Sequence, residues 1–487
     1  MSVLVIGAGA NELTCAHLLA RSGRRVVVLE GRGGQEEPSP DRGWIPPRLV
    51  RELALAPRDL SLGHRDPWAA APLPGGGRLE LWRAMERSVE AIRRVSPRDA
   101  ARWPEFCERM QRLARLLEHL YLGPPPDPLG HAIGDLAQLA VLGWRARRSG
   151  RQGIEDLLRL LPMSVADWLD EWFENDALKG ILGAAGVMHL QQGPRSGGTA
   201  FVLLHHHVGS PHGVFRPPRS NLRQALAGLP GVEIRRGAEV ARIEVRSGRV
   251  AGVTLASGEA LPASLVVSGV DPRRTLLELA DSAWLDPETT RAVKRVRSRG
   301  VVARVRLVLE RAPACPTLVL APALDYLERA YDDAKYGRVS RRPFVEAVSA
   351  GAGADGGSRL EAHVQYAPYA LADGAWSDEH KRALGEVVRG LLSQHAPDLG
   401  AAVVEAVLAP PDLEARYGYP EGQELHAELA LDQVLWMRPV PALARYRTPI
   451  EGLYLCGPGT HPGGGVSAVP GYNAGRAILR DLNRRRA

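Results

Sequence analysis

The chain has 487 residues, of which 45% are hydrophobic and 24% charged, a balance typical of a folded protein and a length that favours two domains. Its 62 basic and 55 acidic residues give a formal net charge of +7. The basic residues are spread among the acids rather than gathered on one stripe, and only four are lysines, at positions 179, 294, 335 and 381. This distribution argues against a nucleic-acid partner.

Four cysteines stand at positions 15, 107, 315 and 456, without a CxxC or CxxxxC pair. A zinc ribbon and a redox disulfide of the glutathione-reductase kind are therefore excluded, and we predict no metal site. No secretory signal precedes the first expected strand, and no run of 18 uncharged apolar residues exists. We expect a cytoplasmic protein. Peripheral membrane contact stays open, because residues 128–144 are typical of a buried or interfacial helix.

The first thirty residues predict a nucleotide-binding unit. Val3–Ile6 and Val26–Leu29 are short apolar runs typical of buried parallel strands, and residues 13–20 between them favour a helix. Gly7 and Gly9 form the turn after the first strand, and Glu30 ends the second. This order is typical of the dinucleotide-binding βαβ unit, in which the helix start faces a pyrophosphate and the acid binds a ribose.

Glu12 departs from that pattern, because the motif has glycine or alanine at its third position. A carboxylate there would lie beside a doubly negative pyrophosphate. At ~5 Å and an effective dielectric constant of ~20, one carboxylate–phosphate repulsion is roughly 3 kcal/mol. The stretch therefore predicts the fold clearly and leaves the strength of cofactor binding open.

The middle of the chain changes pattern twice. From residue 84 to about 172 it is helical, with helix starts at Ser96 and Ser164, and further helices are expected at 175–185 and 197–207. Strand-like runs then return. Hairpin turns are predicted at 247–249 and 257–259, which connect the runs 240–245, 250–255 and 265–268. The predicted strands are 232–234, 240–245, 250–255, 265–268, 301–309, 359–366 and 403–408, and a helix is predicted at 378–394.

The C-terminal segment repeats the order of strand, glycine turn and helix. Residues 452–456 predict a buried strand and 466–483 a long helix. Five glycines lie in the nine residues 457–465 between them, more than a plain strand–helix connection needs. A helix start bared by glycines can donate N–H groups to a cofactor oxygen.

These elements predict an α/β fold with a discontinuous Rossmann-like domain that includes a β-meander, plus a mixed-sheet substrate domain with a helical insertion. The nucleotide domain is assigned to residues 1–83, 215–280 and 445–487. The substrate domain is assigned to residues 84–214 and 281–444.

Several segments together resemble the phytoene desaturase-like family, within the FAD-dependent amine oxidase and carotenoid desaturase superfamily, and most closely its oxidoreductase branch without an assigned substrate. They are GAGAN at 7–11 with Glu30, MSVADWL at 163–169, VVSGVDP at 266–272, LDQVLWMRP at 431–439, and 452–474. The likeness covers nearly the whole chain, and the second glycine turn is its most specific part.

The resemblance implies FAD as the cofactor and assigns its contacts. Gly7 and Gly9, with Ala10 and Asn11 after them, would meet the pyrophosphate, Glu30 the adenosine ribose, and the Val240 backbone the adenine edge. The ribityl chain and flavin ring would meet the second turn, at Gly457, Gly459, Thr460, Gly464, Gly465 and Val466. The chain departs from the family pattern at Glu12, in a shortened segment after Glu30, and at residues 215–222.

Two histidines are candidate catalytic residues. His461 lies in the second glycine turn, where it would shape or polarise the cavity or hold the loop, and His426 matches a histidine of family members and would face substrate. The cluster His205–His207 is not predicted to bind metal, because adjacent helical residues point in different directions. No second nicotinamide-binding unit is found, so reoxidation by oxygen or a quinone-type acceptor is favoured.

Three functions follow as hypotheses. The first is an FAD-dependent oxidoreductase that takes hydride from a small apolar substrate, polyenes included. The second is an amine-oxidase-like flavoenzyme, which an aromatic cage with a catalytic lysine would favour. The third is a flavin-poor relative that serves as an interaction protein, because all three departures fall on cofactor-binding elements. The sequence leaves the oligomeric state open.

Overall fold

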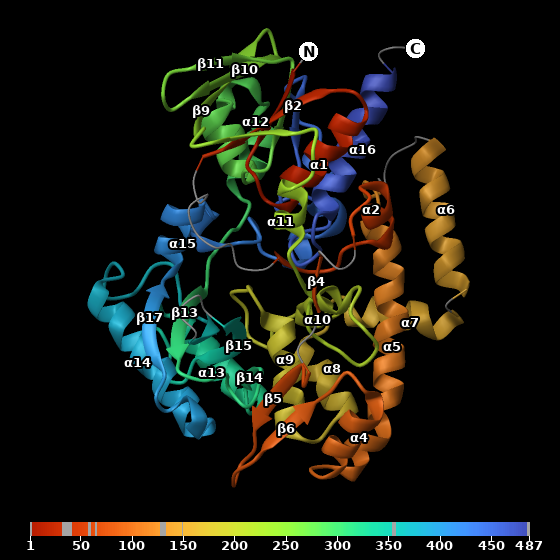
Figure 1. Cartoon of the computed structure of the whole chain (residues 1–487). Coiled ribbons are helices and arrows are strands. Elements are labelled where there is room, and N and C mark those ends of the chain that lie inside the picture. The colour runs from red at the N-terminus through yellow and green to blue at the C-terminus, as the bar shows by residue number, and fades with distance from the viewer. Residues whose placement is uncertain are drawn as a thin grey trace.

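The computed structural model describes residues 2–31, 41–56, 60–63, 66–126, 133–148, 150–352 and 357–484. Two large sheets dominate it, one parallel and one mixed (Figure 1). The parallel sheet lies with the N- and C-terminal segments, and a group of helices packs beside the mixed sheet. The predicted α/β class is confirmed.

The parallel sheet has five strands in the order β18, β12, β1, β2, β8. Their bounds are β1 Ser2–Ile6, β2 Arg25–Glu30, β8 Glu233–Arg236, β12 Leu265–Ser268 and β18 Leu453–Leu455. Leu4 of β1 pairs with Val27 of β2 on one side and with Val266 of β12 on the other. The first and last segments of the chain therefore share one sheet.

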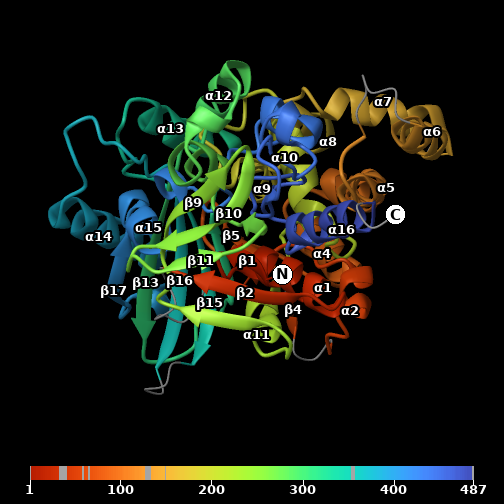
Figure 2. The same ribbon diagram turned by 90° about the horizontal axis from the view of Figure 1, so that it is seen from above.

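Alternate side chains of β1 face opposite layers of this domain. Val3 and Val5 pack with α1 Ala10–Arg21 and α16 Val469–Arg484, whereas Leu4 and Ile6 pack with the meander. Figures 1 and 2 show the two helices on one side of the sheet and the meander on the other. Burial of both faces explains why the strand sequences are continuously apolar.

The meander consists of β9 Val240–Arg246, β10 Arg249–Leu255 and β11 Ala260–Pro262 in antiparallel pairing. Its turns contain Gly248 and Gly258, whose φ angles of +74° and +87° lie in the left-handed region that glycine tolerates. Both turns lie where the sequence predicts hairpins.

The mixed sheet has seven strands in the order β17, β13, β16, β15, β14, β5, β6. Their bounds are β5 Ala69–Pro72, β6 Arg78–Leu81, β13 Val302–Leu309, β14 Thr317–Leu320, β15 Phe344–Ala352, β16 Ser358–Gln365 and β17 Val403–Leu408. Apolar residues of α14 Asp378–His395 pack on β13 and its neighbours. The sequence assigns residues 1–83 to the nucleotide domain, whereas Ala70 of β5 pairs with Leu318 of β14. Residues 69–81 therefore belong to the mixed sheet.

Helices fill the segment from 85 to 207. They are α4 Met85–Arg93, α5 Pro97–Tyr121, α6 Ile133–Arg148, α7 Gly150–Leu160, α8 Val165–Trp172, α9 Asp176–Val187 and α10 Thr199–His207. The Ser96 and Ser164 hydroxyls accept N–H bonds of Asp99 and Asp167, at 3.1 and 3.0 Å, so both predicted helix starts are confirmed. Figures 1 and 2 show α6 at the edge of the molecule, away from both sheets.

Shorter elements connect these parts. They are α2 Pro47–Glu52, α11 Leu222–Ala227, α12 Pro287–Lys294, α13 Leu324–Lys335, α15 Pro410–Tyr417, the π-helix η1 Arg274–Leu279, and a small sheet of β3 Asp41–Arg42, β7 Arg219–Ser220 and β4 Ser61–Gly63. Among the described residues, no helix combines the length and the apolar character that a membrane crossing requires.

A glycine joins the two ends of the nucleotide domain. A Cβ built on Gly471 of α16 would lie 1.8 Å from the Asn11 carbonyl oxygen of α1, so only glycine lets the helices approach this closely. Because the second glycine turn precedes α16, this contact places it close to the first glycine turn, which directly precedes α1.

Candidate functional site

The first glycine turn is formed by backbone geometry that needs glycine. Gly7 has a φ of +100°, and its N–H donates to the Leu29 carbonyl of β2 at 2.9 Å. Gly9 is the N-cap of α1 and has an extended backbone. The start of α1, with Ala10 and Asn11, therefore lies at the carboxyl edge of the sheet, where helix N–H groups favour an anionic ligand.

Glu12 lies under this turn and is only 5% exposed. A Cβ built on Gly9 would lie 2.5 Å from Glu12 Oε2, and one built on Gly269 would lie 1.9 Å from Oε1. The carboxylate is therefore held between the first turn of α1 and the backbone that follows β12. Because Gly269 has no side chain, Glu12 fits at the position where the motif has glycine or alanine. The Glu12 carboxylate nevertheless stays beside the site expected for the pyrophosphate.

Glu30 ends β2 as predicted, but two arginines already face its carboxylate. Arg223 of α11 donates from Nη2 to Glu30 Oε1 at 2.6 Å and from Nε to the Ala8 carbonyl at 2.9 Å. Arg236, at the end of β8, lies 3.6 Å from Oε2. Sequence reasoning did not find this arrangement, because Arg223 is 193 positions from Glu30.

The adenine-side candidate Val240 lies near the same edge. It begins β9, two residues after Ala238, whose N–H donates to the Glu30 carbonyl at 2.9 Å. Val240 is 6% exposed. The structure thus brings Val240 toward Glu30, and its contact with adenine stays a prediction.

The second glycine turn meets the first at Gly269. A Cβ built on Gly457 would lie 2.2 Å from the Gly269 carbonyl oxygen, while Gly269 also adjoins Glu12. Thr460 stabilises the turn, because its hydroxyl and its N–H donate to the Gly457 carbonyl at 2.8 and 3.0 Å. The two predicted halves of the cofactor site are therefore continuous.

Imidazole and apolar side chains surround the far half of this turn. His205 Nε2 donates to the Gly464 carbonyl at 2.7 Å, and the Tyr121 hydroxyl donates to His205 Nδ1, also at 2.7 Å. A Cβ built on Gly464 would lie 2.2 Å from Leu425, and one built on Gly465 would lie 3.2 Å from His206. Val466 completes this apolar part and is 2% exposed.

The three consecutive histidines that the sequence singles out are all buried on α10. Their ring nitrogens donate to three separate carbonyls, those of Gly464, Ala185 and Val214. Burial lowers the pKa of His205 to about 3 and that of His206 to about 4. These two rings are neutral at pH 7, and His205 with Tyr121 fixes the Gly464 carbonyl.

The two candidate catalytic histidines come together at the second turn. His461 lies within it, fully buried, and its Nε2 donates to the Leu120 carbonyl at 3.1 Å. His426 has a φ of +60°, and its Cβ would lie 3.3 Å from a Cβ built on Gly459. Burial lowers the pKa of His426 to about 3 and of His461 to about 4. Among the described residues, His426 Nδ1 has no hydrogen-bond partner.

Arg438 ties the loop before the turn to the turn itself. It is completely buried, and its guanidinium donates to five backbone carbonyls. These belong to Leu425, Ala427, Glu428, Gln433 and Pro458. Arg438 is therefore an internal cation held by backbone carbonyls.

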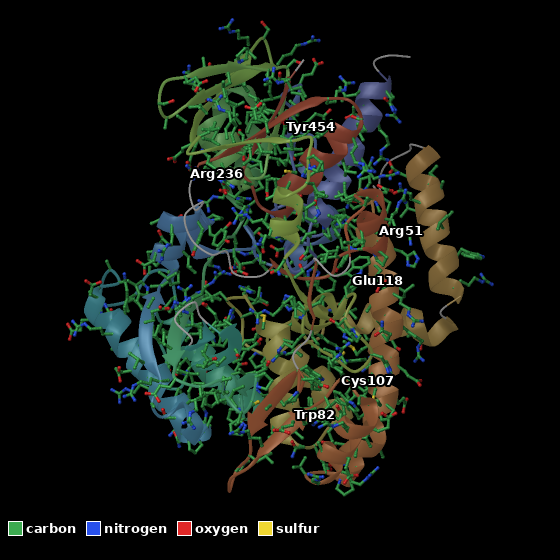
Figure 3. The ribbon with its side chains drawn as sticks, in the orientation of Figure 1. Arg51, Trp82, Cys107, Glu118, Arg236 and Tyr454 are labelled. Carbon is green, nitrogen blue, oxygen red and sulfur yellow. The ribbon has the colours of Figure 1, made fainter. Side chains whose placement is uncertain are left out.

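Two buried cysteines, Cys107 and Cys456, lie in different parts of the molecule. Figure 3 shows Cys107 of α5 and Trp82, which follows β6, in the lower half of the view, whereas Tyr454 of β18 and Arg236 of β8 lie in the upper half with the parallel sheet. Cys456 follows β18 and is buried near Glu12, and burial raises its pKa well above the ordinary value. Cys456 therefore carries a neutral thiol at pH 7.

Neutral buried histidines should make the stability of the fold depend on pH. Between the pKa of unfolded histidine, near 6.5, and that of His461, about 4, the unfolded chain binds the extra proton. Stability is therefore full above pH 6.5 and falls as the pH drops toward 4, by up to about 1.4 kcal/mol per pH unit for one histidine. We expect His461→Gln to reduce this slope by about one proton in urea unfolding measured from pH 7 to 4.5.

The exposed His212 supplies the control for that measurement, because its ring meets water both before and after unfolding. His212→Gln should leave the slope of unfolding free energy against pH unchanged. A wild-type slope equal to that of His461→Gln would contradict the assignment of His461 as a buried neutral ring.

Comparison with known proteins now identifies the family. The model of the family "Flavin containing amine oxidoreductase" matches residues 47–476. The chain is 30% identical to pyridine nucleotide-disulfide oxidoreductase domain-containing protein 2 of Rattus norvegicus, over 98% of this chain and 93% of that protein. The chain belongs to the flavin-containing amine oxidoreductase family. The predicted resemblance is confirmed.

Other relatives extend the comparison. A limonene dehydrogenase subunit of Castellaniella defragrans is 27% identical over 99% of this chain and 94% of that protein. Hydroxyneurosporene desaturase of Cereibacter sphaeroides is 28% identical over 99% and 98%. A solved structure of a putrescine oxidase variant superposes with a TM-score of 0.61 at 16% identity, covering 99% of both chains, and shows the shared fold.

FAD is the cofactor of this family member, and the residues of the chain fit it in most respects. The two glycine turns meet at Gly269, the start of α1 faces the sheet edge, and Glu30 lies at the end of β2. Glu12 and Arg223 are the two unusual groups at the pyrophosphate half. The roles of the individual predicted residues stay predictions.

Proposed function

We propose that the protein is an FAD-dependent dehydrogenase or desaturase that removes two hydrogens from a small apolar substrate. The observation that carries this is the surroundings of the second glycine turn, where apolar side chains and imidazoles held neutral by burial lie together. Apolar side chains and neutral imidazoles suit C–H oxidation, in which FAD, when bound, accepts the hydride.

The chain would contribute orientation and one proton acceptor. Leu425, Leu429 and Val466 would hold an apolar chain and exclude water beside the second turn. His205 fixes the turn through the Gly464 carbonyl. When a carbon–carbon double bond forms, the second hydrogen leaves as a proton, and the candidate acceptor is His426, whose Nδ1 has no hydrogen-bond partner among the described residues. That a limonene dehydrogenase subunit and a hydroxyneurosporene desaturase are relatives supports an apolar, alkene-containing substrate.

The amine-oxidase alternative has less support from the side chains. Three of the four lysines form ion pairs outside the glycine turns: Lys179 with Asp170, Lys335 with Asp332 and Lys381 with Asp412. Lys294, on α12, is exposed. A catalytic lysine at the flavin would have favoured amine oxidation, and none of the four supports it.

A flavin-poor interaction protein is the second candidate, because the buried carboxylate of Glu12 lies at the anion site. The absorbance of purified protein near 450 nm separates the two classes. Flavin that is released and quantified at about one per chain supports the enzyme. Absence of flavin, with no uptake on reconstitution, supports the interaction protein.

The substrate class is tested by anaerobic bleaching of the flavin band. We expect limonene or hydroxyneurosporene to reduce the flavin and putrescine to leave it oxidised. Reduction by putrescine alone would replace the dehydrogenase assignment with amine oxidation.

We also propose a peripheral membrane contact through α6 and α7, from which an apolar substrate would be collected. Leu136, Val141 and Trp144 of α6 and Leu158 of α7 are between 51% and 64% exposed. Residues 145–148, which follow Trp144 in the sequence, read RARR and give this segment positive charge. Apolar and basic residues on one peripheral helix are typical of an interfacial contact with anionic lipid.

Vesicle sedimentation tests this contact. The protein should sediment with phosphatidylglycerol-containing vesicles, and the double variant Leu136→Ser, Trp144→Ser should stay largely in the supernatant, because buried apolar area drives insertion. Trp284→Ser, at a tryptophan 40% exposed elsewhere, is the matched control and should sediment like wild type. If all three proteins sediment equally, α6 does not contribute to membrane binding and the proposed contact is wrong.

A further inference from the structure

Arg223 occupies a distinctive place in the nucleotide half of the site. Its guanidinium spans the first glycine turn and the end of β2, since Nε donates to the Ala8 carbonyl and Nη2 to Glu30. Ala8 lies between the two glycines of the turn, the part of a βαβ unit that approaches the pyrophosphate. The Arg223 side chain is 28% exposed, so a ligand can reach it from the open side.

The charge balance of this corner calls for a cation. Glu12, in the first turn of α1, and Glu30, at the end of β2, bring two nearly fully buried carboxylates to this corner. A dinucleotide adds a doubly negative diphosphate to the same place. The helix start of α1 supplies only partial positive charge, equivalent to about half an elementary charge. Among the described residues, Arg223 is a full cation held across the turn, and Arg236 lies farther out with its side chain 76% exposed.

We propose that Arg223 is a cofactor-binding residue that offsets Glu12 by contacting the diphosphate of FAD. A guanidinium presents a planar fork of donors that matches phosphate oxygens, and charge-assisted bonds of this kind are strong. Glu30 and the Ala8 carbonyl orient the guanidinium before the ligand arrives. The inference rests on the FAD part of the proposed function and is independent of the substrate.

The test measures flavin affinity on apoprotein by fluorescence titration at low salt. Arg223→Gln should raise the Kd for FAD by about 10- to 30-fold, whereas the Kd for riboflavin, which lacks the diphosphate, should change less than about twofold. Arg223→Lys keeps the charge without the fork and should fall between wild type and Arg223→Gln. The loss of FAD affinity on raising salt should also be shallower in Arg223→Gln than in wild type.

Arg25→Gln is the matched control, because Arg25 begins β2 at the end opposite Glu30, is 76% exposed, and carries the same charge. Its Kd for FAD should stay within about twofold of the wild-type value. If Arg223→Gln weakens FAD and riboflavin equally, Arg223 has only a structural role and the proposal is overturned. An unchanged Kd, or no FAD binding by wild type, overturns it as well. A protein that binds FAD through Arg223 but oxidises no apolar substrate would keep this inference and refute only the substrate assignment.

Discussion

Glu12→Gly is expected to lower the Kd for FAD by about 100-fold. The Glu12 carboxylate is 5% exposed and packs against Gly9, at the start of α1. Its repulsion with one phosphate charge is roughly 3 kcal/mol at ~5 Å and an effective dielectric constant of ~20, which corresponds to about two decades in affinity. Fluorescence titration of the apoprotein at low ionic strength measures the change, because salt screens the part of this interaction that reaches solvent.

Glu12→Gln separates charge from size in that experiment. Glutamine fills the space between Gly9 and Gly269 as glutamate does, so a gain in affinity with Glu12→Gln is electrostatic. Glycine in the first turn of α1 also costs about 1 kcal/mol of helix stability, which the glutamine variant avoids. Glu90→Gln, on an exposed site of α4, changes the net charge equally and should leave the Kd unchanged. An unaltered Kd in both Glu12 variants would show that Glu12 is harmless to the cofactor.

Local patterns predicted the central strands of the parallel sheet well, because these strands are buried on both faces. Val3–Ile6 and Val26–Leu29 are continuous apolar runs, and the glycines after them mark the turns. The mixed sheet was predicted less completely. The strand β14 has only four residues, too few for a period to distinguish strand from helix, and its pairing with β5 joins residues about 250 positions apart. No local signal encodes that pairing.

The glycine positions of the site could be predicted, and the charges around them could not. A glycine cluster has few uses, so Gly457–Gly465 indicated a turn near a ligand, and the structure brings it to the first turn at Gly269. Arginine is by far the commoner basic residue of the chain, so Arg223 does not stand out in sequence, and the motif at 431–439 that contains Arg438 does not indicate the partners of this arginine. Their partners are set by tertiary packing: Arg223 meets Glu30 across 193 positions, and Arg438 meets carbonyls rather than acids.

Arg438→Leu is expected to lower the free energy of unfolding by about 3–5 kcal/mol. The guanidinium is fully buried, and burial lowers its pKa to about 9, so it is still charged at pH 7. It donates its hydrogen bonds to carbonyl dipoles, and leucine would leave five buried carbonyls without this donor. The Pro458 carbonyl, which receives two of these bonds at 2.8 and 3.2 Å, belongs to the second glycine turn.

Urea unfolding at pH 7 measures this loss, and flavin retention on dilution should fall in parallel because the turn loses its anchor. Arg438→Lys keeps the charge but offers three donors from one point, so it should recover only part of the stability. Arg291→Leu, on the exposed surface of α12, removes the same charge and should change the unfolding free energy by less than about 0.5 kcal/mol. If Arg438→Leu were no more destabilising than Arg291→Leu, the loop at 425–438 would have to hold the turn through its apolar contacts alone.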